Sequence, residues 1–182
     1  TQIFSTKTAF AALKDDGSVI AWGGSGSGGN TTHSTYGLKQ GDINSNVTYI
    51  YSTEGAFAAL KNDGSVVTWG DDDRGGDSSS VSSQLISGVI QIFSTETAFA
   101  ALKDDGSVVT WGNSDYGGVI SFVGDVTQIF STRSAFAALK NDGSVVTWGS
   151  YGGNSSIVSS QLTSGVVKIF STGTAFAALK ND

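Results

Sequence analysis

Cysteine, proline and methionine are all absent from this chain of 182 residues. Without cysteine the sequence can form no disulfide, no zinc site built on thiolates and no cysteine nucleophile. Without proline the turns must depend on other residues, and the 25 glycines can supply them because glycine tolerates positive φ angles. The missing residues therefore exclude several kinds of site and predict glycine-based turns.

Charged side chains are also scarce, at 14% of the residues. The 16 acidic residues outnumber the 10 basic ones, which gives a formal net charge of −6. Phosphate binding needs clustered lysine and arginine, and no such cluster occurs, so nucleic acid is not an expected partner. No signal peptide or membrane span stands in the sequence. The hydrophobic fraction of 38% and the chain length suffice for a buried core.

A 21-residue block, in contrast, recurs without insertion or deletion. It reads Ile-Phe-Ser-Thr, two variable residues, Ala-Phe-Ala-Ala-Leu-Lys, then Asn/Asp-Asp-Gly-Ser-Val-Val-Thr-Trp-Gly, with few substitutions. The copies are Ile3–Gly23, Ile50–Gly70, Ile92–Gly112, Ile129–Gly149 and, truncated, Ile169–Asp182. Self-similarity of this kind is the mark of a repeat architecture. We therefore expect a single repeat array over residues 1–182.

Each block is expected to hold three short strands, because Val, Thr, Phe and Trp dominate and no apolar period of 3.6 residues persists. In the third block these strands are Val89–Ser94, Ala98–Lys103 and Ser107–Trp111. The Asp-Gly pair between the second and third strands predicts a hairpin turn in which glycine takes a positive φ. This assigns a structural role to Gly17, Gly64, Gly106 and Gly143.

Both faces of these strands carry apolar side chains. Phe99 and Ala101 share one face of the second strand, and Ala98, Ala100 and Leu102 share the other. Each sheet should therefore be covered on both sides by stacked neighbours, and the alanines allow a close approach near a propeller axis. We expect the tryptophans to pack between sheets, with a sugar-binding face as the alternative. They are Trp22, Trp69, Trp111 and Trp148.

The connections between blocks carry all the variation in length. They contain 26, 21, 16 and 19 residues, at 24–49, 71–91, 113–128 and 150–168. Block and connection together suit a propeller blade of about 40–45 residues. We therefore predict an all-β fold. It is a β-propeller of antiparallel blades with three to four strands, the short fourth strand lying in the connection. It is present as a partial array of four full repeats and a truncated fifth.

The two ends of the chain indicate whether it is a whole protein or a segment of one. The fifth block stops after 14 of its 21 residues, and the first residue is Thr1 rather than methionine. A natural domain rarely ends inside a hairpin turn, because the strand left behind has no partner. We expect the chain to be a segment of a larger protein, with an engineered truncation as the alternative.

The motif Ala-Leu-Lys-x-Asp-Gly-Ser-Val-Val-Thr-Trp-Gly resembles the repeat of the regulator of chromosome condensation family. It stands at Ala59–Gly70, Ala101–Gly112 and Ala138–Gly149, with Ala12–Gly23 as a close variant. Three glycine pairs follow Trp-Gly at the spacing of the family's Gly-Gln-Leu-Gly turn, and a fourth follows two residues sooner. They are Gly28-Gly29, Gly75-Gly76, Gly117-Gly118 and Gly152-Gly153. The resemblance implies a propeller, which in this family commonly has seven blades.

Two features depart from the family pattern. The Gln-Leu-Gly part of the turn is lost, and the family's usual histidine at the start of the second strand is replaced by Thr, Ser or Gly. The founding member is a nucleotide-exchange factor that binds a small GTPase and chromatin, and none of its functional residues can be placed on this sequence. The near-identity of the blocks is more similar to the highly regular repeats of large bacterial surface or secreted proteins.

The densest acidic segment is a candidate calcium site. It contains Asp71, Asp72, Asp73 and Asp77. Calcium takes oxygen ligands, but the spacing does not match an EF-hand loop, so a solvated loop is the competing interpretation. The only histidine, His33, stands in the longest connection and is expected to be an exposed loop residue. We predict no catalytic residue, no resident metal and no cofactor.

No acid, base or nucleophile departs from the repeats in a way that indicates catalysis. We therefore predict a non-enzymatic repeat scaffold of a larger extracellular or cell-surface protein, with a cytoplasmic location still open. It would bind a protein or a glycan through the connections between blocks. The first alternative is a structural building block whose copies self-associate into a filament or an extracellular matrix. The second is a regulator of a small GTPase that acts like an exchange factor.

Overall fold

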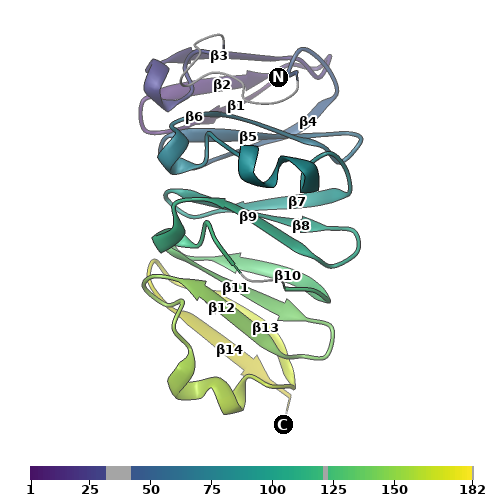
Figure 1. The fold of residues 1–182 in the computed structure, drawn as a ribbon, viewed down its shortest axis with the longest axis vertical. Helices are drawn as coiled ribbons and strands as arrows, with labels where there is room; N and C mark the ends of the chain where they lie inside the picture. The colour runs from purple at the N-terminus through teal and green to yellow at the C-terminus, as the bar shows by residue number, and fades with distance from the viewer. Residues whose placement is uncertain (32–41, 121–122, 182) are drawn as a thin grey trace.

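The computed structural model describes residues 1–31, 42–120 and 123–181, which form strands and short 3-10 helices (Figure 1). The first strand of each repeat is β1 (Gln2–Ser5), β4 (Val47–Ser52), β7 (Val89–Ser94), β10 (Val126–Ser131) or β13 (Val166–Ser171). The second is β2 (Ala9–Leu13), β5 (Ala56–Lys61), β8 (Ala98–Lys103), β11 (Ala135–Lys140) or β14 (Phe176–Lys180). The third is β3 (Val19–Gly23), β6 (Val66–Gly70), β9 (Val108–Gly112) or β12 (Val145–Gly149).

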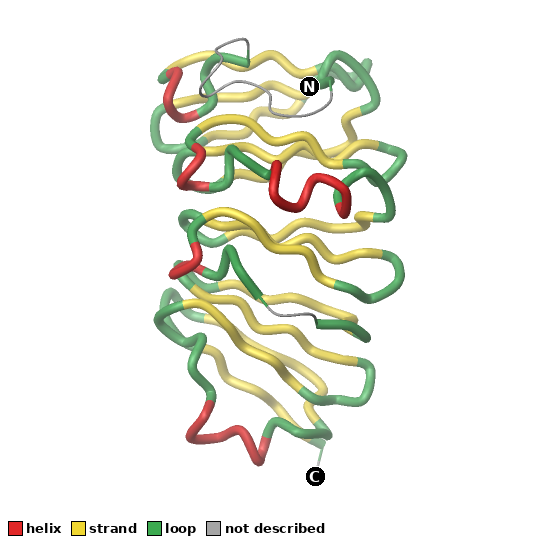
Figure 2. The backbone as a smooth tube through the Cα atoms, in the orientation of Figure 1, coloured by secondary structure: helices red, strands yellow, loops and turns green. Residues whose placement is uncertain are grey.

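These strands form separate antiparallel sheets, one for each repeat. The first four sheets have three strands in chain order, β1-β2-β3 to β10-β11-β12, and the fifth pairs β13 with β14. The sheets stack along the longest axis, with the first and fifth at opposite ends of an open array (Figures 1 and 2). The all-β prediction is confirmed. The first two predicted strands of the third block match β7 and β8, whereas the third strand begins and ends one residue later than predicted.

The Asp-Gly turn has a second use in the stacking of sheets. Gly106 has φ +78°, and its N–H donates to the carbonyl of Lys103 at 3.0 Å, which closes the hairpin. The carbonyl of Gly106 then accepts from the N–H of Val126, the first residue of the next sheet, at 3.0 Å. The same bond recurs in the other hairpins that precede a sheet, so the turn joins neighbouring sheets as well as neighbouring strands.

The core lies between the sheets. One face of the second sheet, with Ala56, Ala58 and Leu60, packs against the face of the third sheet that carries Phe99 and Trp111. Equivalent residues pack between the first and second sheets and between the third and fourth, whereas the two-stranded fifth sheet contributes no tryptophan to its interface. Each inner sheet packs both of its faces against neighbouring sheets, which explains why the strands of the block carry apolar side chains on both faces.

The fourth strand expected in the connections does not form in their described parts. The connections instead contain 3-10 helices, which are η1 (Ser25–Ser27), η2 (Asp72–Arg74), η3 (Ser79–Gln84), η4 (Ser114–Tyr116) and η5 (Ser156–Gln161). Each connection makes one backbone bond to the start of the third strand, as from the Val66 N–H to the Leu85 carbonyl at 2.9 Å. The Ser-rich segments favour local side-chain to backbone bonds over a continued strand ladder.

Candidate functional site

Three of the four tryptophans lie between sheets. Trp69, Trp111 and Trp148 are buried, and each ring stacks on the phenylalanine paired with it on the second strand, with centroids 5.2–5.3 Å apart. The Trp111 indole N–H donates across the interface to the carbonyl of Gly75, at 3.0 Å. Trp22 differs, because no described sheet lies in front of the first one, and 43% of its surface is exposed. These rings therefore act in sheet packing wherever a preceding sheet is present.

The glycine pairs after Trp-Gly complete this contact. Gly75 has φ +94°, and a β-carbon there would lie 2.6 Å from Cδ2 of Phe99 in the next sheet. A β-carbon on Gly76 would lie 2.4 Å from the carbonyl oxygen of Gly70. Only residues without a side chain fit at either position. The glycine pair is thus required because the connection lies directly against an aromatic ring and a backbone.

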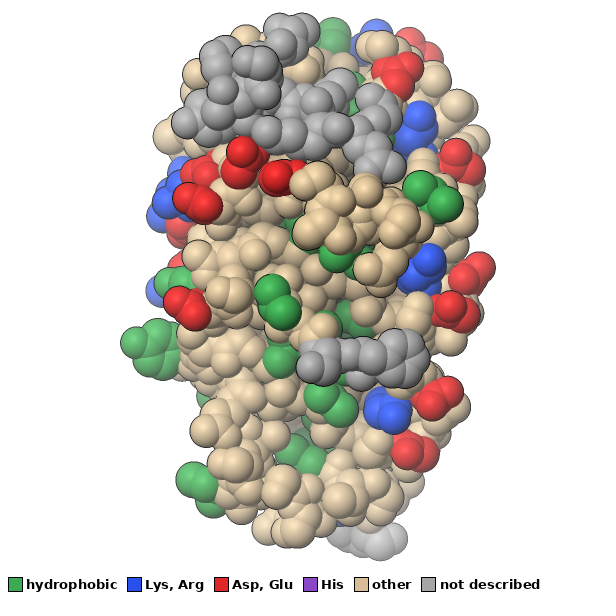
Figure 3. Space-filling view, in the orientation of Figure 1, with side chains coloured by type: hydrophobic (Ala, Val, Ile, Leu, Met, Phe, Trp, Pro, Cys, Tyr) green, Lys and Arg blue, Asp and Glu red, His purple; other side chains and the backbone are tan. Residues whose placement is uncertain are grey.

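Acidic side chains of the second connection form hydrogen bonds and an ion pair within their own turns. The Asp71 carboxylate accepts from the N–H of Asp73 at 3.0 Å and forms an ion pair with Arg74. Asp77 accepts from the N–H of Ser79 at 2.8 Å. In Figure 3 acidic side chains gather on the upper left of the molecule. Across the described ranges, no group of three or more His, Cys, Asp or Glu side chains is arranged to hold a metal ion. His33 lies outside the described residues.

A row of short loops, each between the first and second strands of its sheet, runs along one side of the array, at one end of the strands. Each loop contains the two variable residues of its block, at 7–8, 54–55, 96–97, 133–134 and 173–174. Backbone bonds join the loops in succession. They run from the N–H of Lys7 to the Glu54 carbonyl, Glu54 to Glu96, Glu96 to Arg133 and Arg133 to Gly173, at 2.8–3.1 Å. The variable positions are therefore held at fixed spacing by a backbone ladder across all five sheets.

The side chains on this ladder carry both signs of charge. Lys7 pairs with Glu54 at 2.6 Å, and the Nε of Arg133 lies 3.8 Å from a carboxylate oxygen of Glu96. The loops border a shallow, open hollow of about 480 Å³, to which every sheet contributes. The Lys7 and Arg133 side chains are 67% and 73% exposed, so their cationic groups remain accessible to a partner.

A connection begins beside each of the first four loops, where the N–H of its first residue donates to the last carbonyl of the loop at 2.8–3.0 Å. The N–H of Asp71 donates to the Gly55 carbonyl at 2.9 Å, and the buried Thr53 hydroxyl donates to the Arg74 carbonyl at 2.8 Å. We call this surface the variable end, and it comprises the five variable pairs together with η1, η2 and η4. In the first three repeats the constant threonine of the block thus fixes the connection to the variable loop.

The sequence analysis predicts binding through the connections and does not single out the variable pairs. The signal was present, because these two positions are the ones in the block that change most freely. Their alignment at one end depends on the stacking of sheets, which a single block does not reveal. At the variable end, the variable loops and the first turns of the connections lie side by side in one surface.

No family model matches this chain, and no curated protein matches it. Among the described residues, no helix is long and apolar enough to cross a membrane.

Solved structures are similar to the chain in fold. Human WBSCR16 superposes with a TM-score of 0.54 and 20% identity, over 82% of this chain and 47% of that one. Yeast RCC1 (Prp20), bound to Kap60, gives 0.53 and 18%, over 81% and 43%. The ectodomain of the receptor kinase CR4 from Physcomitrella patens gives 0.53 and 20%, over 84% and 40%. This chain spans less than half the length of each, and the likeness shows a propeller repeat fold.

Proposed function

We propose that this chain is a non-enzymatic propeller scaffold that binds a protein partner through its variable end. The observation that carries the proposal is the backbone ladder, which presents differing side chains at constant spacing on otherwise near-identical repeats. A rigid platform with variable residues at one end is an arrangement typical of binding proteins, because function is commonly carried by loops on a fixed frame.

A protein is favoured over a glycan by the side chains present. The variable pairs supply two cations and two carboxylates, Lys7, Arg133, Glu54 and Glu96, and contain no aromatic ring. The tyrosine of η4, Tyr116, is partly buried and packs against the core between the third and fourth sheets. Two of the similar structures are also described with protein partners, since yeast Prp20 is bound to Kap60 in one and studied for binding to Gsp1p and histones in another. We also propose that the chain belongs to the regulator of chromosome condensation family, which its repeat motif resembles.

An extracellular or cell-surface setting is part of the proposal. It is supported by the regularity of the blocks, which is similar to that of large bacterial surface proteins.

The test compares two sets of variants at opposite ends of the strands. In the first set Lys7, Glu54, Glu96 and Arg133 are each changed to serine. In the matched control Asp15, Asn62, Asp104 and Asn141, at the hairpin turns of the other end, are changed to serine. Immobilised chain is exposed to the protein fraction of its source cells and to a glycan array. We expect a polypeptide to be retained by the native chain and the control and lost by the first set.

Equal retention by all three proteins would contradict the assignment of the variable end. A glycan bound by the native chain and lost in the first set would change the partner class from protein to glycan. Thermal unfolding of each variant, measured in parallel, separates lost binding from lost folding.

A further inference from the structure

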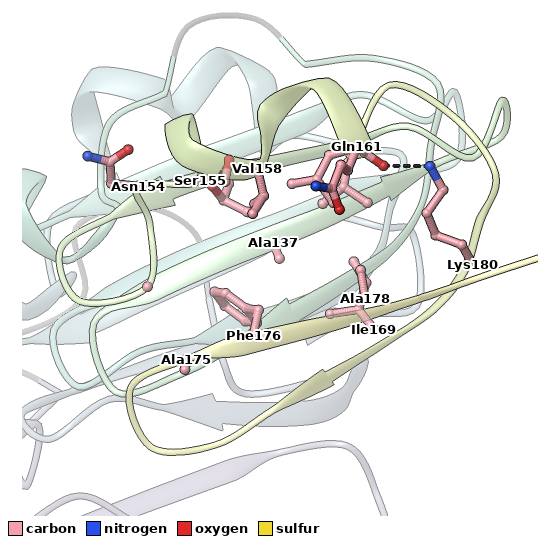
Figure 4. A pocket seen from close by; sticks show the side chains of 14 residues that line it. Ala137, Asn154, Ser155, Val158, Gln161, Ile169, Ala175, Phe176, Ala178 and Lys180 are labelled. Atoms are coloured by element: carbon pink, nitrogen blue, oxygen red, sulfur yellow. Dashed lines mark hydrogen bonds between the residues drawn. The ribbon is translucent and has the colours of Figure 1, made fainter.

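The hollow at the variable end differs in kind from a cavity inside the stack. That cavity, of about 370 Å³, lies between the fourth and fifth sheets (Figure 4). Ala137, Ile169 and Phe176, which line it, belong to the apolar cluster that packs those sheets together. The hollow at the variable end is instead open to solvent and bordered by charged side chains. It is therefore the surface on which a partner can be recognised by charge.

The two positions of each variable pair face in different directions. In the first four repeats the first position lines the hollow, and its residues are Lys7, Glu54, Glu96 and Arg133. In the first two repeats the second position lies against the connection. A β-carbon on Gly55 would lie 2.8 Å from Cδ of Arg74, and one on Gly24 would lie 2.6 Å from Oγ1 of Thr8. Side chains at the first position therefore meet a partner, whereas the second position fits the loop to its connection.

The backbone of this row offers a partner little to bind, because the ladder already uses it. The N–H of each of the four charged residues donates to the carbonyl of the next first-position residue. The hydroxyls of Thr53 and Thr95 are bound to carbonyls of the connections, at 2.8 and 3.0 Å. Recognition at the hollow therefore depends on the charged side chains.

The four charges follow the order positive, negative, negative, positive along the ladder. Lys7 pairs with Glu54 on one side, and Arg133 lies beside Glu96 on the other. The two carboxylates are on neighbouring rungs, because the Glu54 N–H donates to the Glu96 carbonyl at 2.8 Å. Like charges on neighbouring rungs repel each other. Cations of a partner placed over the two carboxylates would relieve this repulsion, and carboxylates of the partner would fit the exposed cations on either side.

The spacing of the row suits a helix. Backbones joined by hydrogen bonds in a ladder lie about 5 Å apart, so the four charges span about 15 Å. A helix presents positions i, i+4, i+7 and i+11 on one stripe, which spans about 16 Å at a rise of about 1.5 Å per residue. An extended strand presents residues of one face about 6.7 Å apart, so four of them span about 20 Å. A helix therefore matches the four charges more closely than a strand does.

We propose that the row of Lys7, Glu54, Glu96 and Arg133 binds an α-helix of the protein partner, an assignment that rests on the proposed function of the variable end. The helix carries a carboxylate at position i, Lys or Arg at i+4 and i+7, and a carboxylate at i+11. Each charge then faces its opposite. A helix with the signs exchanged is rejected, because like charges meet at all four positions.

The probes are two dye-labelled helical peptides of about 20 residues, built on alanine and glutamine. The first carries Glu, Lys, Lys and Glu at i, i+4, i+7 and i+11. The second carries Lys, Glu, Glu and Lys there, so the two peptides have the same composition and net charge. Fluorescence anisotropy at low salt should show the first peptide binding the whole native chain at least about 10-fold more tightly than the second. The difference should shrink as salt is added.

A chain with the row reversed is the matched control. Each of the four charges is replaced by its opposite, as Lys7→Glu, Glu54→Lys, Glu96→Lys and Arg133→Glu. The net charge and both ion pairs are kept with their signs exchanged, so this chain should fold as the native one does. It should prefer the second peptide by a similar factor, a result that a difference in peptide helicity would not produce. In the native chain, NMR signals of the loops at 6–8, 53–55, 95–97 and 132–134 should shift when the first peptide is added.

Equal affinity for the two peptides, a preference that the reversed chain does not exchange, or NMR signals that shift only at the hairpin turns would overturn the proposal. Equal binding of the first peptide with a proline at its centre, which interrupts the helix, would do the same. If the reversed chain fails to fold, the peptides and the NMR signals of the native chain decide the matter. Capture of a cellular polypeptide at the variable end, with both peptides bound equally, would remove this inference and leave the proposed function standing.

Discussion

The indole N–H of Trp111 donates to the carbonyl oxygen of Gly75 over 3.0 Å, from one sheet to the connection that leaves the preceding one. The bond couples two features of the sequence that stand 36 residues apart, the Trp-Gly that ends a block and the glycine pair that follows the block before it. It recurs from Trp69 to Gly28 and from Trp148 to Gly117, at 3.0 and 3.1 Å. The block is therefore built for contact with its neighbour.

Loss of the Trp111 ring should be costly. Trp111→Ala should lower the free energy of unfolding by about 3–5 kcal/mol, because it empties a buried site between sheets. Trp111→Phe keeps an aromatic ring but leaves the Gly75 carbonyl unpaired, and should cost about 1–3 kcal/mol. The matched control is Trp22→Ala at the exposed counterpart. Urea denaturation measures all three, and a smaller loss for Trp111→Ala than for Trp22→Ala would contradict the packing.

The glycine pair gives a prediction of its own. Gly75→Ala should destabilise the fold by about 2–4 kcal/mol, since the new β-carbon meets the Phe99 ring and the backbone keeps a positive φ. Gly26→Ala is the control, because a β-carbon at that position meets nothing within 4 Å. Thermal unfolding of the two variants should therefore show a lower midpoint for the first and little change for the second. Equal midpoints would show that the connection does not lie against Phe99.

The hairpin aspartates predict a dependence of stability on pH. The hydroxyl and N–H of Ser65 bond to the Asp63 carboxylate and hold its pKa below the ordinary value of 3.8. The pKa values of Asp16, Asp105 and Asp142 are lowered by the same contacts with Ser18, Ser107 and Ser144. The unfolded chain lacks these bonds, so its aspartates titrate at the higher, ordinary pKa. Their contribution to stability is complete above that value and is lost as pH falls through the folded-state pKa.

Replacing the four turn serines with alanine tests this assignment. Denaturation midpoints measured between about pH 2 and pH 7 should fall less steeply below about pH 4 in the variant than in the native chain. The variant keeps the backbone N–H donors, so part of the dependence should remain. Parallel curves for the two proteins would show that the serine hydroxyls do not set these pKa values.

The strands were predictable because their signals are local. Val, Phe, Thr and Trp favour strands, and Asp-Gly fixes the hairpin, so β7 and β8 were placed to the residue from the third block alone. Three kinds of feature were beyond sequence reasoning. The first is the 3-10 structure of the connections, because Ser-rich segments give no strong periodic signal. The second is the acceptor of each tryptophan, which is a backbone carbonyl in another repeat.

The third is the variable end. Lys7 and Glu54 are separated by a block and a connection, and nothing in either segment shows that their backbones bond to each other. Only the stacking of sheets brings the variable pairs together. The candidate calcium residues are close in sequence but do not come together in one site. Asp71 and Asp77 each bond within their own turn.

The exchange of the indole protons tests the central claim, that the blocks join sheet to sheet through buried tryptophans. In a sample labelled with ¹⁵N-tryptophan, each indole N–H gives one NMR signal, which Trp→Phe variants assign. Hydrogen-bonded and buried protons exchange slowly with solvent. The structure predicts slow exchange for Trp69, Trp111 and Trp148 and fast exchange for Trp22. Four signals that all exchange at the fast rate would contradict the account.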